Sequence, residues 1–99
     1  MEDDVGYFHS KFNSLRKDIL LYLWINQERG LTVRDISNSM DKDYSYCHKI
    51  VSEFENHELV ERTKEKRKKI IELTTHGREL GEVLEQLYSK LDKLDEKID

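Results

Sequence analysis

Apolar residues recur at helical spacing near the start of the chain, at intervals of four, three, four and four residues. This spacing places them on one face of a helix, so it predicts helical structure over residues 5–28, with Gly30 as the stop signal. Asn13 or Ser14 can cap a separate helix, and the pattern leaves one helix or two open. The residues on this face are Phe8, Phe12, Leu15, Ile19 and Leu23.

Two further helical segments follow, joined by a polar turn. Thr32 and Asp35 have the spacing of a capping box, with aspartate in the usual glutamate position, and they predict a short helix that ends before Asp41. Asp43 can cap the next helix, predicted over roughly residues 44–58. The apolar residues of the two segments are Val33, Ile36 and Met40, then Cys47, Ile50, Val51 and Phe54.

The next part of the chain has the pattern of a β-hairpin. Residues 59–63 and 69–73 are strand-like, and the segment 64–68 between them is highly basic. A two-stranded hairpin is marginally stable alone, so we expect it to pack on the helices.

The strongest periodicity lies at the carboxyl end, where Thr74 can cap a helix over about residues 75–98. Its leucines follow an unbroken heptad pattern over roughly 36 Å at 1.5 Å per residue. So small a domain cannot cover such a stripe alone, so we predict that a second copy pairs with it, parallel or antiparallel. The alternative is packing on the chain's own N-terminal helix. The predicted dimerisation residues are Leu80, Leu84, Leu87, Leu91, Leu94 and Ile98.

This order of elements predicts a mainly α fold with a small β-hairpin, a winged helix-turn-helix with a long C-terminal dimerisation helix. Residues 1–74 would form the winged-helix DNA-binding domain with its N-terminal helix, and residues 75–99 the coiled-coil dimerisation helix. A chain of 99 residues supports one hydrophobic core and is too short for two.

Composition argues against several other classes of protein. No apolar run reaches the roughly 18 residues of a membrane span, and the acidic N-terminus lacks signal-peptide character, so a cytoplasmic protein is expected. The single cysteine and the scattered histidines predict neither a disulfide within the chain nor a metal site. No phosphate-binding glycine loop or nucleophile motif is present, so we expect neither an enzyme nor a cofactor.

Charge is unevenly distributed along the chain. The net charge of -4 argues against nucleic acid as a partner. Residues 62–69, however, hold six positive charges and one negative, whereas residues 78–99 hold four positive and seven negative. Such a separation can orient the protein on DNA.

In a helix-turn-helix unit the second helix lies in the major groove and its first residues reach the bases. We therefore predict double-stranded DNA as the partner, with helix 44–58 in the major groove and the wing 62–69 on the backbone or in the minor groove. Amides at the helix starts can bind phosphate. The predicted DNA-binding residues are Thr32, Arg34, Tyr44, Ser45, Tyr46, His48, Lys49, Ser52, Arg62, Lys64, Lys66, Arg67 and Lys68.

Several short motifs occur in a fixed order over about residues 31–80. They are Ile50-Val51, Leu59-Val60-Glu61-Arg62, Glu65-Lys66-Arg67, Leu73-Thr74 and Gly77. Together they resemble the multiple-antibiotic-resistance-regulator (MarR) type of winged helix. The resemblance implies a homodimeric transcription regulator of pseudo-palindromic DNA, with Arg67 as the wing arginine, and it allows a small-molecule effector that nothing else indicates. The dominant C-terminal helix is also similar to that of small archaeal and viral winged-helix proteins.

The sequence favours a transcription regulator, with repression as its expected role. Two alternatives stay open: a DNA-organising protein with little sequence preference, and a winged-helix protein-interaction module. Cys47 is interpreted as a buried core residue or, alternatively, a redox sensor, and Trp24 as a core residue or part of a ligand pocket.

Overall fold

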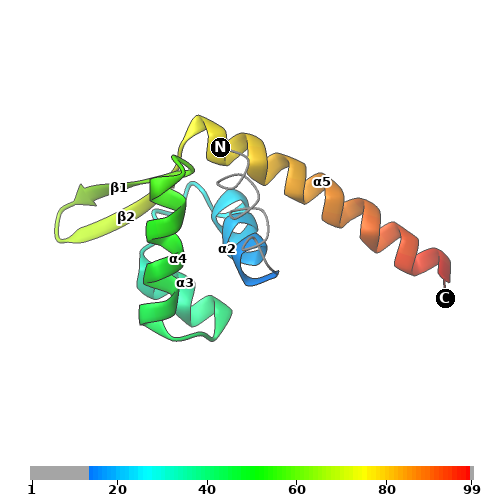
Figure 1. Ribbon diagram of the computed structural model, residues 1–99, viewed down its shortest axis with the longest axis horizontal. Helices are drawn as coiled ribbons and strands as arrows, with labels where there is room; N and C mark the ends of the chain where they lie inside the picture. Colours follow the sequence, from blue (N-terminus) through cyan, green and yellow to red (C-terminus); the bar gives the residue numbers. More distant parts are fainter. Residues whose placement is uncertain (1–13, 99) are drawn as a thin grey trace, which may run out of the picture.

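The computed structural model describes residues 14–98, and Phe8, Phe12 and the rest of the predicted helical start lie outside them. The predicted order and type of elements are confirmed for the described residues. Helices α3 and α4 pack together, the hairpin extends to one side, and α5 runs away on the other (Figure 1). The elements are α2 (Ser14–Ile25), α3 (Val33–Met40), α4 (Tyr44–Asn56), β1 (Val60–Glu65), β2 (Lys68–Leu73) and α5 (Thr75–Ile98).

Helix α2 ends earlier than the sequence predicts, at Ile25. The side-chain amide of Asn26 donates to the Tyr22 carbonyl at 2.9 Å, and Arg29 N donates to the Asn26 carbonyl at 3.0 Å, so a turn follows the helix. Gly30 lies in this turn with a φ of +65°, a conformation that favours glycine. The prediction that the helix extends to residue 28 was therefore wrong, because Gly30 belongs to the turn that follows α2 and does not mark the end of the helix.

The predicted caps of α3 and α4 are confirmed. Thr32 Oγ1 accepts a hydrogen bond from Asp35 N at 3.2 Å, and Asp35 Oδ2 accepts one from Thr32 N at 2.9 Å, which completes the capping box. Asp43 accepts from Tyr46 N at 3.3 Å at the start of α4. Helix α4 ends at Asn56, two residues before its predicted end. The core joins α2, α3, α4 and the hairpin through Ile19, Leu20, Leu23, Ile36, Cys47, Ile50, Val51, Phe54, Val60 and Ile71.

The hairpin strands are longer than predicted, and the turn between them holds only Lys66 and Arg67. The strands are antiparallel, with Arg62 opposite Ile71. Leu31 adds an isolated bridge on the far side of β2, where Ile71 N donates to the Leu31 carbonyl at 2.8 Å. The pattern of the sequence did not predict this bridge, which ties the start of the helix-turn-helix unit to the wing.

Helix α5 begins as predicted, with Gly77 N donating to Thr74 Oγ1 at 3.1 Å. A Cβ atom at Gly77 would lie 2.0 Å from the Leu59 carbonyl oxygen, so only glycine allows the helix to approach the hairpin this closely. One turn later, Gly81 lies against Trp24 of α2, and the Trp24 indole donates to Glu85 at 3.3 Å. Trp24 of α2 therefore packs against α5 and the core, in agreement with its interpretation as a core residue.

The six predicted dimerisation residues divide into two groups. Leu84 is only 5% exposed and belongs to the chain's own core, and Leu80 packs against that core. These two leucines pack the first part of α5 on the chain's own core, and their part in a dimer interface stays a prediction. Leu87 and Leu91 are each 45% exposed and Leu94 is 55% exposed, whereas the Ile98 side chain lies outside the described part. No helix within residues 14–98 is both long and apolar enough to cross a membrane.

Candidate nucleic-acid interface

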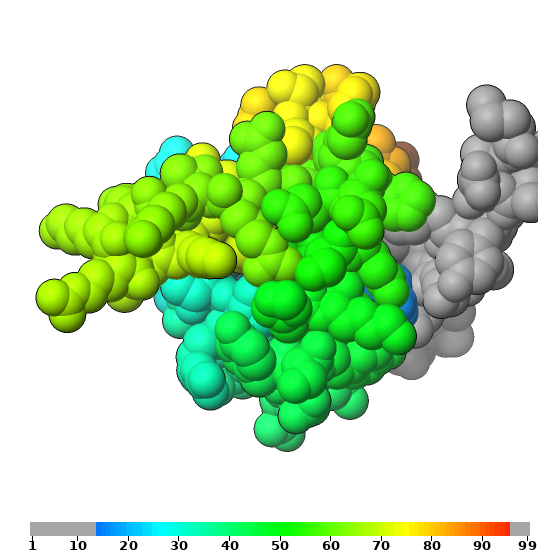
Figure 2. All heavy atoms as spheres, turned by 60° about the vertical axis from the view of Figure 1, so that its left-hand side comes forward, coloured from blue at the N-terminus to red at the C-terminus, as the bar shows by residue number. Residues whose placement is uncertain are grey.

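The outer face of α4 lies on the same side of the molecule as the hairpin (Figure 2). The residues on its inner face are fully buried, which fixes the orientation of the helix. Of the predicted contacts on α4, Ser52 is half-buried, and the exposed ones are Tyr44, Ser45, Tyr46, His48 and Lys49. The exposed set begins at the first residue of the helix, where a recognition helix reaches the bases.

Contacts between aromatic and charged side chains join the starts of α3 and α4. The Arg34 guanidinium lies over the Tyr44 ring, 4.8 Å from its centroid, a cation–π contact. The Tyr44 and His48 rings are tilted by 34° with centroids 6.2 Å apart. These contacts bring three predicted DNA-binding residues together where α3 and α4 begin.

A groove runs between these helix starts and the hairpin. Residues of α3, α4 and both strands contribute to its lining. The side chains that line it include four cations and no carboxylate. The lining residues are Thr32, Val33, Arg34, Tyr44, His48, Arg62, Arg67 and Lys69. Six of the predicted residues are therefore brought together, although the Thr32 hydroxyl is already bound to Asp35. Lys69 was missed because the sequence pattern assigned it only to a strand; its place in the basic run was the available signal.

Arg62 is committed to holding the hairpin against α4. Its Nε donates to Glu55 Oε1 at 3.2 Å, and its second guanidinium nitrogen donates to Ser52 Oγ at 2.8 Å. The two predicted contacts Arg62 and Ser52 are thus hydrogen-bonded to each other, and this pair sets the angle between the wing and α4.

A second arginine anchors α4 from behind. Arg16 of α2 donates through Nε to Glu53 Oε2 at 2.7 Å and through a terminal nitrogen to Glu53 Oε1 at 2.9 Å, the bidentate geometry that suits a guanidinium. The hydrogen bond to Glu53 raises the pKa of Arg16, with a smaller contribution from Tyr46. Arg16 therefore holds α4 at Glu53 and interacts with Tyr46, two turns earlier. The sequence pattern missed this pair, since 37 residues separate its partners.

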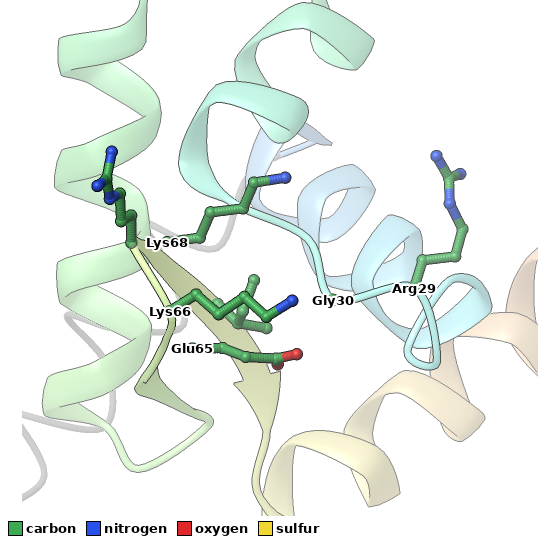
Figure 3. A pocket seen from close by; sticks show the side chains of 7 residues that line it. Arg29, Gly30, Glu65, Lys66 and Lys68 are labelled. Carbon is green, nitrogen blue, oxygen red and sulfur yellow. The ribbon is translucent and has the colours of Figure 1, made fainter.

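Below the tip of the hairpin, a second pocket faces the turn between α2 and α3. Lys66 and Lys68 extend from the hairpin toward the loop that carries Arg29 and Gly30, and Glu65 lies beside Lys66 (Figure 3). Lys68 lines this pocket and Lys69 lines the groove, whereas Arg67 of the turn lines both.

The remaining chemistry-bearing residue near α4 is Cys47. Its thiol is buried, and burial raises its pKa, so its thiolate form is disfavoured. No group of three or more metal-binding side chains is found among residues 14–98.

Neither a protein-family model nor a curated protein matches the chain. Solved structures of MepR, a transcription regulator of the Staphylococcus aureus multidrug efflux pump MepA, are similar. One is 22% identical, covers 99% of this chain and 73% of that chain, and has a TM-score of 0.81. A MepR–DNA complex is 22% identical, covers 94% and 68%, and has a TM-score of 0.78. An identity this low establishes the fold alone. The chain therefore shares the fold of MepR, and the winged-helix fold that its sequence predicts is confirmed.

Proposed function

We propose that the protein is a homodimeric, DNA-binding transcription regulator. The observation that carries the proposal is the single surface formed by the exposed face of α4 and the cationic groove beside it. In this proposal α4 enters the major groove, and the groove and hairpin bind the phosphate backbone. MepR, whose structures share this fold, has been solved in complex with DNA.

The proposed dimer uses the exposed apolar face of α5. Val83, Leu87, Leu91 and Leu94 are large exposed apolar residues on this helix, spaced so that they share one face. A second copy covering this face would bring two α4 helices to one duplex, with half-sites about 34–36 Å apart. Residues 75–99 would then act as the dimerisation segment and residues 1–74 as the DNA-binding segment.

The first experiment measures binding to duplex DNA from upstream of the protein's own gene by fluorescence anisotropy, with a scrambled duplex in parallel. We expect Lys49→Ala to weaken the specific duplex more than the scrambled one, because Lys49 lies on the base-reading face. Arg67→Ala should weaken both duplexes alike, because a backbone contact carries no sequence information. Lys93→Ala removes the same charge from α5 and serves as the control. Equal and negligible effects of Lys49→Ala and Arg67→Ala would contradict the proposed surface.

The second experiment tests the dimer by sedimentation velocity. Leu91→Lys should convert the dimer to a monomer, because it places a charge in the centre of the apolar face, whereas the neighbouring exposed Lys90→Ala should leave the dimer intact. A wild-type monomer at working concentrations would contradict the proposal.

A DNA-organising role with little sequence preference is the second candidate. It is favoured by the groove, whose four cations suit the phosphate backbone of any base sequence. Equal affinity for the upstream and scrambled duplexes would select this role. Increased reporter expression on deletion of the gene would instead support a repressor.

A further inference from the structure

The register of the hairpin divides its charged side chains between two faces. Side chains alternate along a strand, and residues paired across an antiparallel ladder share a face. The pairs Arg62–Ile71 and Lys64–Lys69 therefore share a face, which continues the buried Val60–Leu73 pair. This cationic face carries three positive charges and no negative one. It consists of Arg62, Lys64 and Lys69.

The opposite face has a different balance of charge. Glu61 lies opposite Glu72, Glu65 lies opposite Lys68, and Thr63 lies opposite the buried Ile70. This acidic face thus holds three carboxylates and one ammonium group. Lys68, which the sequence places beside Lys69 in one basic run, has a carboxylate as its direct cross-strand neighbour.

The two pockets beside the hairpin separate Lys69 from Lys68 and share only Arg67 of the turn. Lys69 lines the groove that contains Arg34 and Tyr44. Lys68 and Glu65 instead line the pocket that faces the loop of Gly30 (Figure 3). A duplex seated on α4 and the groove is therefore adjacent to Lys69, and the hairpin lies between that duplex and Lys68.

We propose that the strands of the hairpin bind duplex DNA through their cationic face, beside the contact made by Arg67 in the turn, so that Lys69 is a phosphate-binding residue and Lys68 is not. This inference rests on the proposed function and assigns the orientation of the wing on the duplex. The strands place three carboxylates and one ammonium group on the acidic face. Arg29, Lys66 and Arg67 add positive charge around Lys68 at the tip, so the repulsion of phosphate comes from the base of this face, where Glu61 lies opposite Glu72.

The experiment compares Lys69→Ala with Lys68→Ala, a matched pair of neighbouring exposed lysines. Both variants lose one charge, and Lys64→Ala is a second variant on the cationic face. Affinity for one random duplex is measured by anisotropy across a series of salt concentrations. Each phosphate contact contributes roughly 0.9 to the slope of log K against log salt. We expect Lys69→Ala and Lys64→Ala each to reduce the slope by about one unit, and Lys68→Ala by less than half as much.

Urea unfolding shows whether each variant is folded as well as the wild type, which we expect because all three lysines are exposed. A slope change for Lys68→Ala equal to or larger than that for Lys69→Ala, with wild-type binding intact, would overturn the one-face proposal and leave the proposed function standing. Failure of the wild type to bind any duplex at low salt would overturn both.

Discussion

The buried pair between Arg16 and Glu53 allows a quantitative test of how α4 is held in place. The substitution Glu53→Gln keeps the shape of the side chain and removes its charge. The Arg16 side chain is 7% exposed and that of Glu53 is 22% exposed, so the guanidinium would remain buried without its carboxylate. Breaking a buried pair by removing one partner costs about 3–5 kcal/mol. Because glutamine can still accept a hydrogen bond, we expect the lower end, about 3 kcal/mol.

The same helix offers a matched control two residues away. Glu55 also pairs with an arginine, Arg62, at 3.2 Å, but its side chain is 44% exposed. An exposed ion pair contributes about 0.2–1 kcal/mol, so Glu55→Gln should reduce the free energy of unfolding by less than about 1 kcal/mol. The two substitutions are chemically identical. The pairs differ in burial and in the number of hydrogen bonds, which is two for Glu53 and one for Glu55.

Urea unfolding at one fixed protein concentration measures both variants, because the stability of a dimer depends on concentration. Fluorescence of Trp24, the single tryptophan, reports the loss of contact between α2 and α5. With a urea m-value near 1.5 kcal/mol per molar, 3 kcal/mol lowers the unfolding midpoint by about 2 M. Equal midpoints for the two variants, or a loss below about 1 kcal/mol for Glu53→Gln, would refute the argument that this pair anchors α4.

Three further predictions concern the packing around this core. Gly77→Ala should destabilise the fold by several kcal/mol, roughly the range of severe core substitutions, because its Cβ would overlap the Leu59 carbonyl oxygen; a normal urea midpoint would contradict this. Thr32→Ala should reduce the free energy of unfolding by about 1 kcal/mol through loss of the cap, measured in the same assay with exposed Ser89→Ala as the control. Burial raises the pKa of the Cys47 thiol, so iodoacetamide at neutral pH should label it slowly in buffer and rapidly in urea; rapid labelling of the native protein would show that it is accessible.

The elements that could be predicted from the sequence are those specified by contacts within a few residues. The caps Thr32, Asp43 and Thr74 each bind an amide three residues further along the chain, so type and spacing alone reveal them. The buried stripe of α4 is equally local, because helical geometry places its members on one face. Tertiary contacts that join distant residues, such as Arg16 to Glu53 and Leu31 to Ile71, leave no periodic trace.

The heptads of α5 show how one pattern can serve two purposes. The spacing that contains Leu84 continues unchanged to Leu91, but the first residue lies in the core and the second is exposed. What separates them is the point at which α5 leaves the body of the molecule (Figure 1). The periodicity of the sequence indicates an apolar face on α5. The packing of α2 against α5 determines which part of that face stays exposed and can bind a partner.

The same distinction resolves the conflict between an acidic chain and a nucleic-acid partner. At physiological ionic strength the Debye length is about 8 Å, so phosphates respond to nearby charges and weakly to the total. Helix α5, which carries much of the acid, runs away on the side opposite the hairpin (Figure 1). Within the basic run itself, strand alternation and not composition determines which lysines face the groove. The net charge of the chain is therefore a poor predictor of DNA binding. The register of the six-residue strand β2 is a better one, because it determines which lysines lie beside the groove.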